Sequence, residues 1–229
     1  MKHYGLIGKH LGHSWSADYF TRKFAAEGID ADYRLIELNA LWEGVPDNLD
    51  GYNVTIPYKQ AIIPYLNSLD PIAAEIGAVN VVKDGVGYNT DWIGALKAIN
   101  DTFVNVPIAN STKKALILGQ GGAAKAVRYA VKSLGMDSEM ISARGRIVSD
   151  LSEYVLIVNA TPLGMYPDIT SCPDLRYDTL TPQQVLFDCV YNPEETEFLK
   201  RGKAHGAKTI GGFTMLIEQA RASWEIWNQ

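Results

Sequence analysis

The feature that most constrains the fold is a junction between an apolar run and a helical pattern. Lys114–Leu118 form the apolar run, Gly119–Ala123 follow as Gly-Gln-Gly-Gly-Ala, and a helix pattern begins there. Glycines permit a tight turn and let backbone N–H groups approach an anion. This order predicts a βα unit whose loop can hold a phosphate group. The alternative is a glycine-rich turn without a ligand.

The alternation of strand and helix patterns extends over most of the chain and predicts an α/β fold. The Asp84-Gly85 pair predicts a tight hairpin turn, and 102–113 have the composition of a linker. We expect strands at 3–8, 33–38, around Asn53, 78–83, 86–88, 114–118, 139–142, 155–159, 185–190 and 208–210. We expect helices from an N-cap at Ser16 to Gly28, through 62–66, from Asp70-Pro71 through Ile76, from Thr90 or Asp91 through Ile99, and at 123–134, 196–205 and 215–227.

Length and charge narrow the functional classes. The chain has 229 residues, enough for one large or two modest domains, and a net charge of −5 argues against general nucleic-acid binding. No apolar run approaches the ~20 residues needed to span a bilayer, so no membrane partner is expected. The N-terminus lacks a signal-peptide pattern, and Cys172 and Cys189 lack metal or redox spacing, so we expect a cytoplasmic protein. The four histidines form no ligand pattern, and no metal site is expected.

A polar cluster stands out in Gly51–Lys59. Asn53 and Thr55 are two residues apart and would share one face of a strand, and Lys59 follows a proline. An amide, a hydroxyl and an ammonium suit a small, oxygen-rich molecule, and the lysine can move a proton. The alternative is an ordinary strand end with a solvated lysine.

The end of the second strand after the glycine loop predicts the cofactor. NAD sites usually place a carboxylate there, whereas this chain has Ser142 followed by Arg144 and Arg146. Guanidinium groups match the 2′-phosphate of NADP, so NADP is favoured over NAD. A solvated basic turn is the alternative.

Four further polar residues are candidates for substrate contacts. Asp91 follows the hairpin at a helix start, Asn80 opens the hairpin, and Ser14 and Ser16 lie at a strand-to-helix turn. Each has a structural alternative as a cap or a turn residue.

In order along nearly the whole chain, these blocks resemble the shikimate dehydrogenase family. Asn53–Lys59 match its N-V-T-x-P-x-K block, and Gly119–Ala123 match its G-x-G-G-A loop. The other similar blocks are Gly5–Gly8, His13–Ser16, Ala78–Asn80, Asn89–Gly94, Asn159–Met165, Asp188–Pro193 and Gly212–Gln219.

The resemblance implies reversible NADP-dependent reduction of 3-dehydroshikimate to shikimate, in aromatic amino-acid biosynthesis. It implies a substrate domain at 1–90, with the helix of 212–229 packing back on it, and a linker helix plus Rossmann-like NADP domain at 91–211. Lys59 and Asp91 would be the catalytic pair. Ser14, Ser16, Asn53, Thr55, Asn80, Tyr191 and Gln219 would bind substrate. The cofactor would be bound by Gly119, Gln120, Gly121, Gly122, Ala123, Ser142, Arg144, Arg146, Asn159, Ala160, Thr161, Val190, Gly212 and Met215.

The chain departs from the family pattern at three points. Ala17 replaces a proline, and Ala143-Arg144-Gly145 replaces the N-R-T phosphate clamp. Only Gly145–Tyr154 separate the second strand of the NADP domain from the next, too few for a helix and another strand. We therefore predict that the usual third strand is absent, which shortens the sheet to the order 2-1-4-5-6 in Rossmann counting.

Other functions are also compatible with the sequence. A related enzyme acting on quinate or an amino-shikimate with NAD has the same blocks. A metabolite-binding protein without activity, or an interaction scaffold, would keep only the fold. A monomer and a homodimer are both compatible with the sequence, and Trp224 and Trp227 are expected to pack internally.

Overall fold

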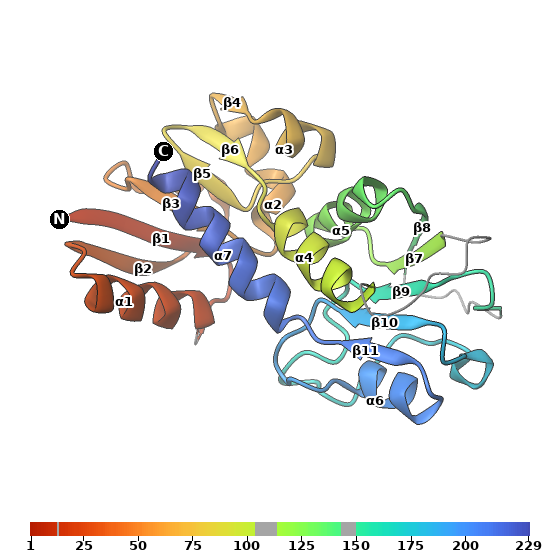
Figure 1. Ribbon diagram of the computed structural model, residues 1–229. Helices are drawn as coiled ribbons and strands as arrows, with labels where there is room; N and C mark the ends of the chain where they lie inside the picture. The colour runs from red at the N-terminus through yellow and green to blue at the C-terminus, as the bar shows by residue number, and fades with distance from the viewer. Residues whose placement is uncertain (13, 104–113, 143–149) are drawn as a thin grey trace. The chain divides into compact units, whose positions relative to one another are not determined.

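The computed structural model describes residues 1–12, 14–103, 114–142 and 150–229. The chain forms two compact units (Figure 1). Unit 1 comprises Met1–Thr90 with Ala220–Gln229, and unit 2 comprises Asp91–Gln219. Most of the expected linker, 104–113, lies outside the described residues, and residues 102 and 103 belong to a helix.

Unit 1 is built on a six-stranded mixed sheet in the order β2-β1-β3-β5-β6-β4. β1 pairs in parallel with both β2 and β3, whereas β5 pairs with β3 and β6 in antiparallel fashion. The strands are β1 (Lys2–Gly8), β2 (Ala31–Glu37), β3 (Gly51–Val54), β4 (Ser68–Leu69), β5 (Val81–Lys83) and β6 (Val86–Tyr88). The helices are α1 (Trp15–Glu27), α2 (Tyr58–Ala61) and α3 (Pro71–Ile76), with short 3-10 turns η1 (Leu41–Glu43) and η2 (Ile63–Tyr65).

Alternation along β1 sends side chains to two cores, as the pleat requires. Tyr4 and Leu6 pack with α1 residues and with Trp227, whereas Ile7 packs with Val54 and Ile62 on the other face. Trp227 is buried, and its ring stacks on Tyr4 with centroids 4.8 Å apart. The expected internal packing of this tryptophan is confirmed. In Figure 1, α1 lies along the β1–β2 part of the sheet.

The first helix begins two residues earlier than expected. Ser14, not Ser16, is the N-cap residue, with extended backbone angles of φ −106° and ψ 121°. Its side chain makes no capping hydrogen bond. Two serines two residues apart are equally suitable as N-caps by residue type, so sequence alone does not decide between them. Ser16 lies inside the first turn, and Gly28 ends the helix in the left-handed conformation at φ 64°.

The helix expected through 62–66 is wrong. α2 ends at Ala61, and a 3-10 turn covers Ile63–Tyr65. Pro64 lacks the N–H that an α-helix needs at this position. The predicted helix start at Asp70-Pro71 is confirmed, because the Asp70 side chain accepts hydrogen bonds from the N–H groups of Ile72 and Ala73. The predicted hairpin turn is also confirmed, because Asp84 and Gly85 have positive φ angles of 51° and 73°.

Unit 2 contains a five-stranded parallel sheet in the order β11-β10-β9-β7-β8. The strands are β7 (Lys114–Leu118), β8 (Asp137–Ile141), β9 (Leu156–Asn159), β10 (Val185–Asp188) and β11 (Lys208–Ile210). The helices are α4 (Asp91–Phe103), α5 (Gly122–Ser133), α6 (Glu197–Ala204) and α7 (Phe213–Trp227), and η3 (Tyr177–Thr179) lies before β10. α7 contributes its last turns to unit 1.

The sheet order agrees with the shortened Rossmann order, because counting β7 as the first strand gives 2-1-4-5-6. Residues 143–149 of the crossover lie outside the described residues, and the described part, 150–155, contains no strand. β8 is therefore an edge of the sheet as far as the structure describes it.

Two cores cover the faces of this sheet. Ala115, Ile117 and Val158 pack with α4 and α5, whereas Leu116 and Leu118 pack with Phe198 of α6 on the opposite face. Figure 1 shows α4 and α5 on one side of the strands and α6 on the other. The carboxyl ends of the strands remain at one edge, where open α/β sheets bind ligands.

Candidate active site

The parallel strands β1 and β3 of unit 1 end at one edge, and the predicted substrate residue Thr55 follows β3 there. The N–H of Thr55, one residue beyond β3, donates to the carbonyl of Ile7 at 2.9 Å. A Cβ on Gly8 would lie 2.7 Å from Cγ2 of Thr55. The ends of β1 and β3 are therefore in direct contact.

The loop before Ser14 is held by a residue that sequence reasoning missed. Glu37 ends β2, and its carboxylate accepts hydrogen bonds from the N–H groups of Leu11 at 2.6 Å and Gly12 at 3.4 Å. These hydrogen bonds hold the pKa of the Glu37 carboxyl below its ordinary value. Ser14 is buried at the end of this loop, and Ser16 is half-buried in α1.

Asn53 has little capacity left for a ligand. The side chain is 6% exposed, and its Nδ2 donates to the carbonyl of Asn80 and to Oγ of Ser223, both at 3.1 Å. Its Oδ1 accepts from the hydroxyl of Tyr33 at 2.8 Å. Both hydrogens of Nδ2 are donated to protein acceptors, so only Oδ1 has a lone pair that could accept a hydrogen bond from a ligand.

Asn80 extends the same buried network. Its Oδ1 accepts from the N–H of Thr90 at 2.6 Å, and its Nδ2 donates to Oγ1 of Thr90 at 3.0 Å. The hydroxyls of Thr90 and Ser223 are 3.2 Å apart. Sequence reasoning found the two asparagines and missed Tyr33, Thr90 and Ser223. For Ser223, the available signal was a serine on the same side of the last helix as Ala220, followed by Trp224.

The predicted catalytic pair comes from two elements. Lys59 is half-buried in α2, and its backbone carbonyl accepts from the N–H of Val79 at 2.7 Å. Asp91 is buried as the first residue of α4. Gln219 is half-buried in α7, and its Nε2 donates to the carbonyl of Leu216 at 2.9 Å. Lys59 belongs to unit 1 and the other two to unit 2, and their roles stay predictions.

The glycine-rich loop joins β7 to α5 as expected. Gly119 has φ 127°, and a Cβ there would lie 2.8 Å from the carbonyl oxygen of Ala160, so only glycine suits this position. Gly121 is the N-cap of α5, and a Cβ there would meet no protein atom within 4 Å. The space beside Gly121 lies at a helix N-terminus, where N–H groups and the helix dipole attract an anion.

The remaining predicted cofactor residues lie on several elements. Gln120 is exposed and Ala123 half-buried at the start of α5, and Ser142 is exposed directly after β8. Arg144 and Arg146 lie outside the described residues. Gly212 has no room for a side chain, since a Cβ would lie 2.6 Å from the carbonyl oxygen of Cys189. Met215 is buried in the core beside α4.

Two polar side chains lie side by side at the ends of β9 and β10. Asn159 and Asp188 are paired in register, and Nδ2 of Asn159 donates to Oδ1 of Asp188 at 3.0 Å. Burial raises the pKa of Asp188 to about 6, and hydrogen bonds from Thr196, the N–H of Val190 and Asn159 offset part of this rise. Sequence reasoning named Asn159 as a cofactor residue and gave Asp188 no role, although a lone carboxylate in an apolar strand is a signal.

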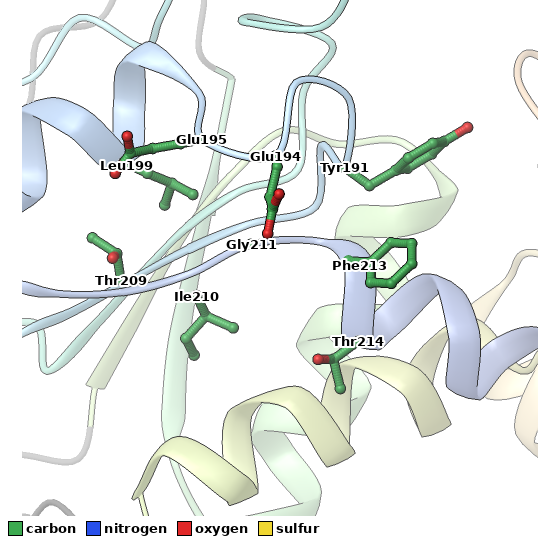
Figure 2. Close-up of a pocket in the computed structure, with 9 residues that line it drawn as sticks. All are labelled: Tyr191, Glu194, Glu195, Leu199, Thr209, Ile210, Gly211, Phe213 and Thr214. Atoms are coloured by element: carbon green, nitrogen blue, oxygen red, sulfur yellow. The ribbon is translucent and has the colours of Figure 1, made fainter. Parts of the chain in front are cut away.

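A pocket of about 600 Å³ opens at the β11 edge of unit 2 (Figure 2). Tyr191 lines it from the loop after β10, and Phe213 and Thr214 line it from the first turn of α7. Tyr191 is the only predicted substrate residue among its lining residues, and none belongs to the glycine-rich loop. This pocket therefore does not coincide with the predicted phosphate site.

Across the parts of the chain that the structure describes, no three potential metal ligands come together. The described helices include none with the length and apolar character to cross a membrane. Cys172 and Cys189 form no disulfide and are partly buried.

Comparison with known proteins gives consistent similarities over both units. Residues 6–82 match the family model described as the shikimate dehydrogenase substrate binding domain. A shikimate dehydrogenase (NADP(+)) of Clostridium beijerinckii is 36% identical, covering 100% of this chain and 93% of the relative.

Solved structures give the same result. A shikimate dehydrogenase crystallised with NADP+ has a TM-score of 0.84 and 33% identity, covering 99% of this chain and 89% of that one. A quinate dehydrogenase from Corynebacterium glutamicum, in complex with NAD, has a TM-score of 0.81 and 27% identity, covering 99% and 93% of the two chains.

Proposed function

Because the chain belongs to the shikimate dehydrogenase family, we propose that it catalyses the reversible, NADP-dependent reduction of 3-dehydroshikimate to shikimate. The main support is the sequence similarity to NADP-dependent relatives, which extends over both units. The product would feed aromatic amino-acid biosynthesis. We place the enzyme in the cytoplasm, in keeping with two cysteines that form no disulfide.

Unit 2 supports the cofactor assignment. The open space at Gly121 and the N-terminus of α5 suit a pyrophosphate, with Gly119–Ala123 around it. Ser142, Arg144 and Arg146 would hold the 2′-phosphate. Ala160, Thr161, Val190, Gly212 and Met215 would line the rest of the dinucleotide. When bound, NADPH supplies a hydride to the ring ketone.

Lys59 and Asp91 would carry the proton chemistry. As hydride reaches the carbonyl carbon, negative charge grows on its oxygen, which a lysine ammonium stabilises and protonates. Asp91, at the first turn of α4, would hold that ammonium in place.

The other predicted residues would orient the ring. Ser14 and Ser16 would bind the substrate carboxylate, assisted by Thr55 and Tyr191. Asn80 and Gln219 would contact hydroxyl groups. Since both amide hydrogens of Asn53 are committed within unit 1, its Oδ1 would accept a hydrogen bond from a substrate hydroxyl.

A second candidate function is quinate dehydrogenation with NAD, favoured by the similarity to the quinate dehydrogenase. Quinate and shikimate differ little at the reacting centre. Turnover should therefore be measured with each substrate and each cofactor side by side. Shikimate with NADP should give the highest kcat/KM, and a preference for quinate with NAD would overturn the assignment.

Lys59→Ala tests the mechanism. Loss of a general acid should lower kcat by about 10²–10⁴-fold. Lys97→Ala is the matched control, because Lys97 is exposed on α4 and pairs with Asp101. Near-normal turnover by Lys59→Ala would refute the proton-transfer role.

A further inference from the structure

A buried polar bridge lies beneath two loops that carry predicted cofactor residues. Asn159 ends β9 and Asp188 ends β10, and both side chains are 0% exposed. The loop after β9 carries Ala160 and Thr161, and the loop after β10 carries Val190. The 3.0 Å hydrogen bond between the two side chains joins the bases of these loops.

The side chain of Asn159 is fully committed to protein partners. Its Nδ2 donates to Asp188 and to the carbonyl of Leu163 at 3.1 Å. Its Oδ1 accepts from the N–H of Thr161 at 3.1 Å and from Oγ1 of Thr161 at 2.6 Å. An amide has two donors and two main acceptor positions, so none remains for a dinucleotide. Asn159 shapes the turn at 160–163 and does not suit the predicted role of direct cofactor ligand.

Asp188 holds the loop after β10 in the way that Asn159 holds the turn after β9. Its Oδ1 also accepts from the N–H of Val190 at 2.9 Å, and its Oδ2 accepts from Oγ1 of Thr196 at 2.6 Å. Thr196 is the N-cap of α6. One carboxylate therefore fixes both ends of the segment 190–196. A buried carboxylate held by neutral donors alone is costly, so stability does not explain its presence.

The bridge is also coupled to the glycine-rich loop. The carbonyl oxygen of Ala160 lies so close to Gly119 that a Cβ would be 2.8 Å from it. The N–H of Ala160 donates to the carbonyl of Leu118 at 2.9 Å, and the N–H of Cys189 donates to the carbonyl of Asn159 at 2.9 Å. A shift of Asn159 would therefore move both the phosphate loop and the loop after β10.

We propose that Asn159 and Asp188 are positioning residues that hold the loops 160–163 and 189–191 in the arrangement that receives the dinucleotide, without touching it. The inference rests on the proposed function only for the identity of the dinucleotide. It assigns the pair an effect on cofactor affinity that a purely structural pair would not have.

The test is the dissociation constant of NADP, measured by isothermal titration calorimetry without substrate. Asn159→Ala and Asp188→Ala should each raise this constant about tenfold or more, since each removes a buried hydrogen bond that orients a loop. Asp188→Asn keeps an oxygen that accepts from Asn159 and Val190, so it should stay within about threefold of wild type. Because the loop 189–191 also carries Tyr191, the deciding measurement is NADP binding in the absence of substrate, not the KM for shikimate.

Gln184→Ala is the matched control. Gln184 is a buried amide directly before β10, and its Nε2 donates to the carbonyls of Leu151 and Tyr154. It lies at the opposite end of the strand, so its loss should lower thermal stability and leave NADP affinity within about twofold. If the alanine variants do not fold, Asn159→Ser, which keeps a hydroxyl near Asp188, should still raise the constant about fivefold.

The outcomes separate the two proposals. A wild-type protein that binds NADP but does not oxidise shikimate would remove the proposed function and leave this inference testable. Folded Asn159 variants that bind NADP as wild type does would overturn the inference. The same holds if Gln184→Ala weakens NADP binding as strongly as Asn159→Ala.

Discussion

Asp188→Asn should make the protein more stable at neutral pH and change how stability depends on pH. In the folded protein the pKa of Asp188 is about 6, against an ordinary value of 3.8, chiefly because burial disfavours the carboxylate. The folded state therefore binds this proton more tightly than the unfolded state. The stability due to protonation is fully present below about pH 3.8 and is lost as pH rises through about 6.

The magnitude follows from these two pKa values. Their difference corresponds to about 3 kcal/mol at pH values above both. Asparagine mimics the protonated acid and carries no such penalty. Part of the penalty is already incurred at about pH 5, so the stability of Asp188→Asn relative to wild type should grow by about 1.4 kcal/mol between about pH 5 and about pH 8.

The assay is urea unfolding of both proteins, followed by far-ultraviolet circular dichroism across this pH range. The quantity of interest is the difference between their free energies of unfolding, because other carboxylates titrate equally in both. Asp174→Asn, at an exposed position of unit 2, controls for the change in net charge. A difference that stays flat with pH, or that shrinks as pH rises, would refute the reasoning.

Three other substitutions give distinct outcomes. Gly94→Ala should cost at least about 1 kcal/mol in urea unfolding, despite alanine's helix propensity, because its Cβ would lie 2.3 Å from the carbonyl oxygen of Met215; a stabilised variant would contradict this. Tyr33→Phe should cost about 1–3 kcal/mol by leaving the buried Oδ1 of Asn53 without its donor, whereas the exposed Tyr65→Phe should be neutral; equal melting temperatures would count against the network. Gly121→Ala should change the free energy of unfolding by no more than about 0.5 kcal/mol while weakening NADP binding about tenfold. Unaltered NADP binding would show that the pyrophosphate is not bound at this loop.

The alternation of strands and helices could be predicted because it depends on local patterns. Lys114–Leu118 and the glycines after it were placed correctly, as was the turn at Asp84-Gly85. The short α2 was missed because the apolar spacing of Ile62, Ile63 and Leu66 suggested a helix that Pro64 prevents. The missing N–H of Pro64 outweighs the apolar periodicity at this position.

The candidate site was only partly accessible from sequence for a different reason. A motif names residues but does not say how their hydrogen-bonding capacity is used. Asn53 and Asn159 were both predicted to contact ligands, yet most of the capacity of the first and all of that of the second serve protein partners. Two of those partners, Ser223 for Asn53 and Asp188 for Asn159, come from distant elements and are set by tertiary packing.

The split composition of unit 1 has a consequence for synthesis. Its first strand is synthesised before its last helix, so the ring of Tyr4 is not covered by Trp227 until that helix has been made. All of unit 2 is translated in between, so that domain can complete its sheet while the amino-terminal sheet still lacks part of its core. During that interval exposed aromatic rings would make the nascent chain a target for chaperones.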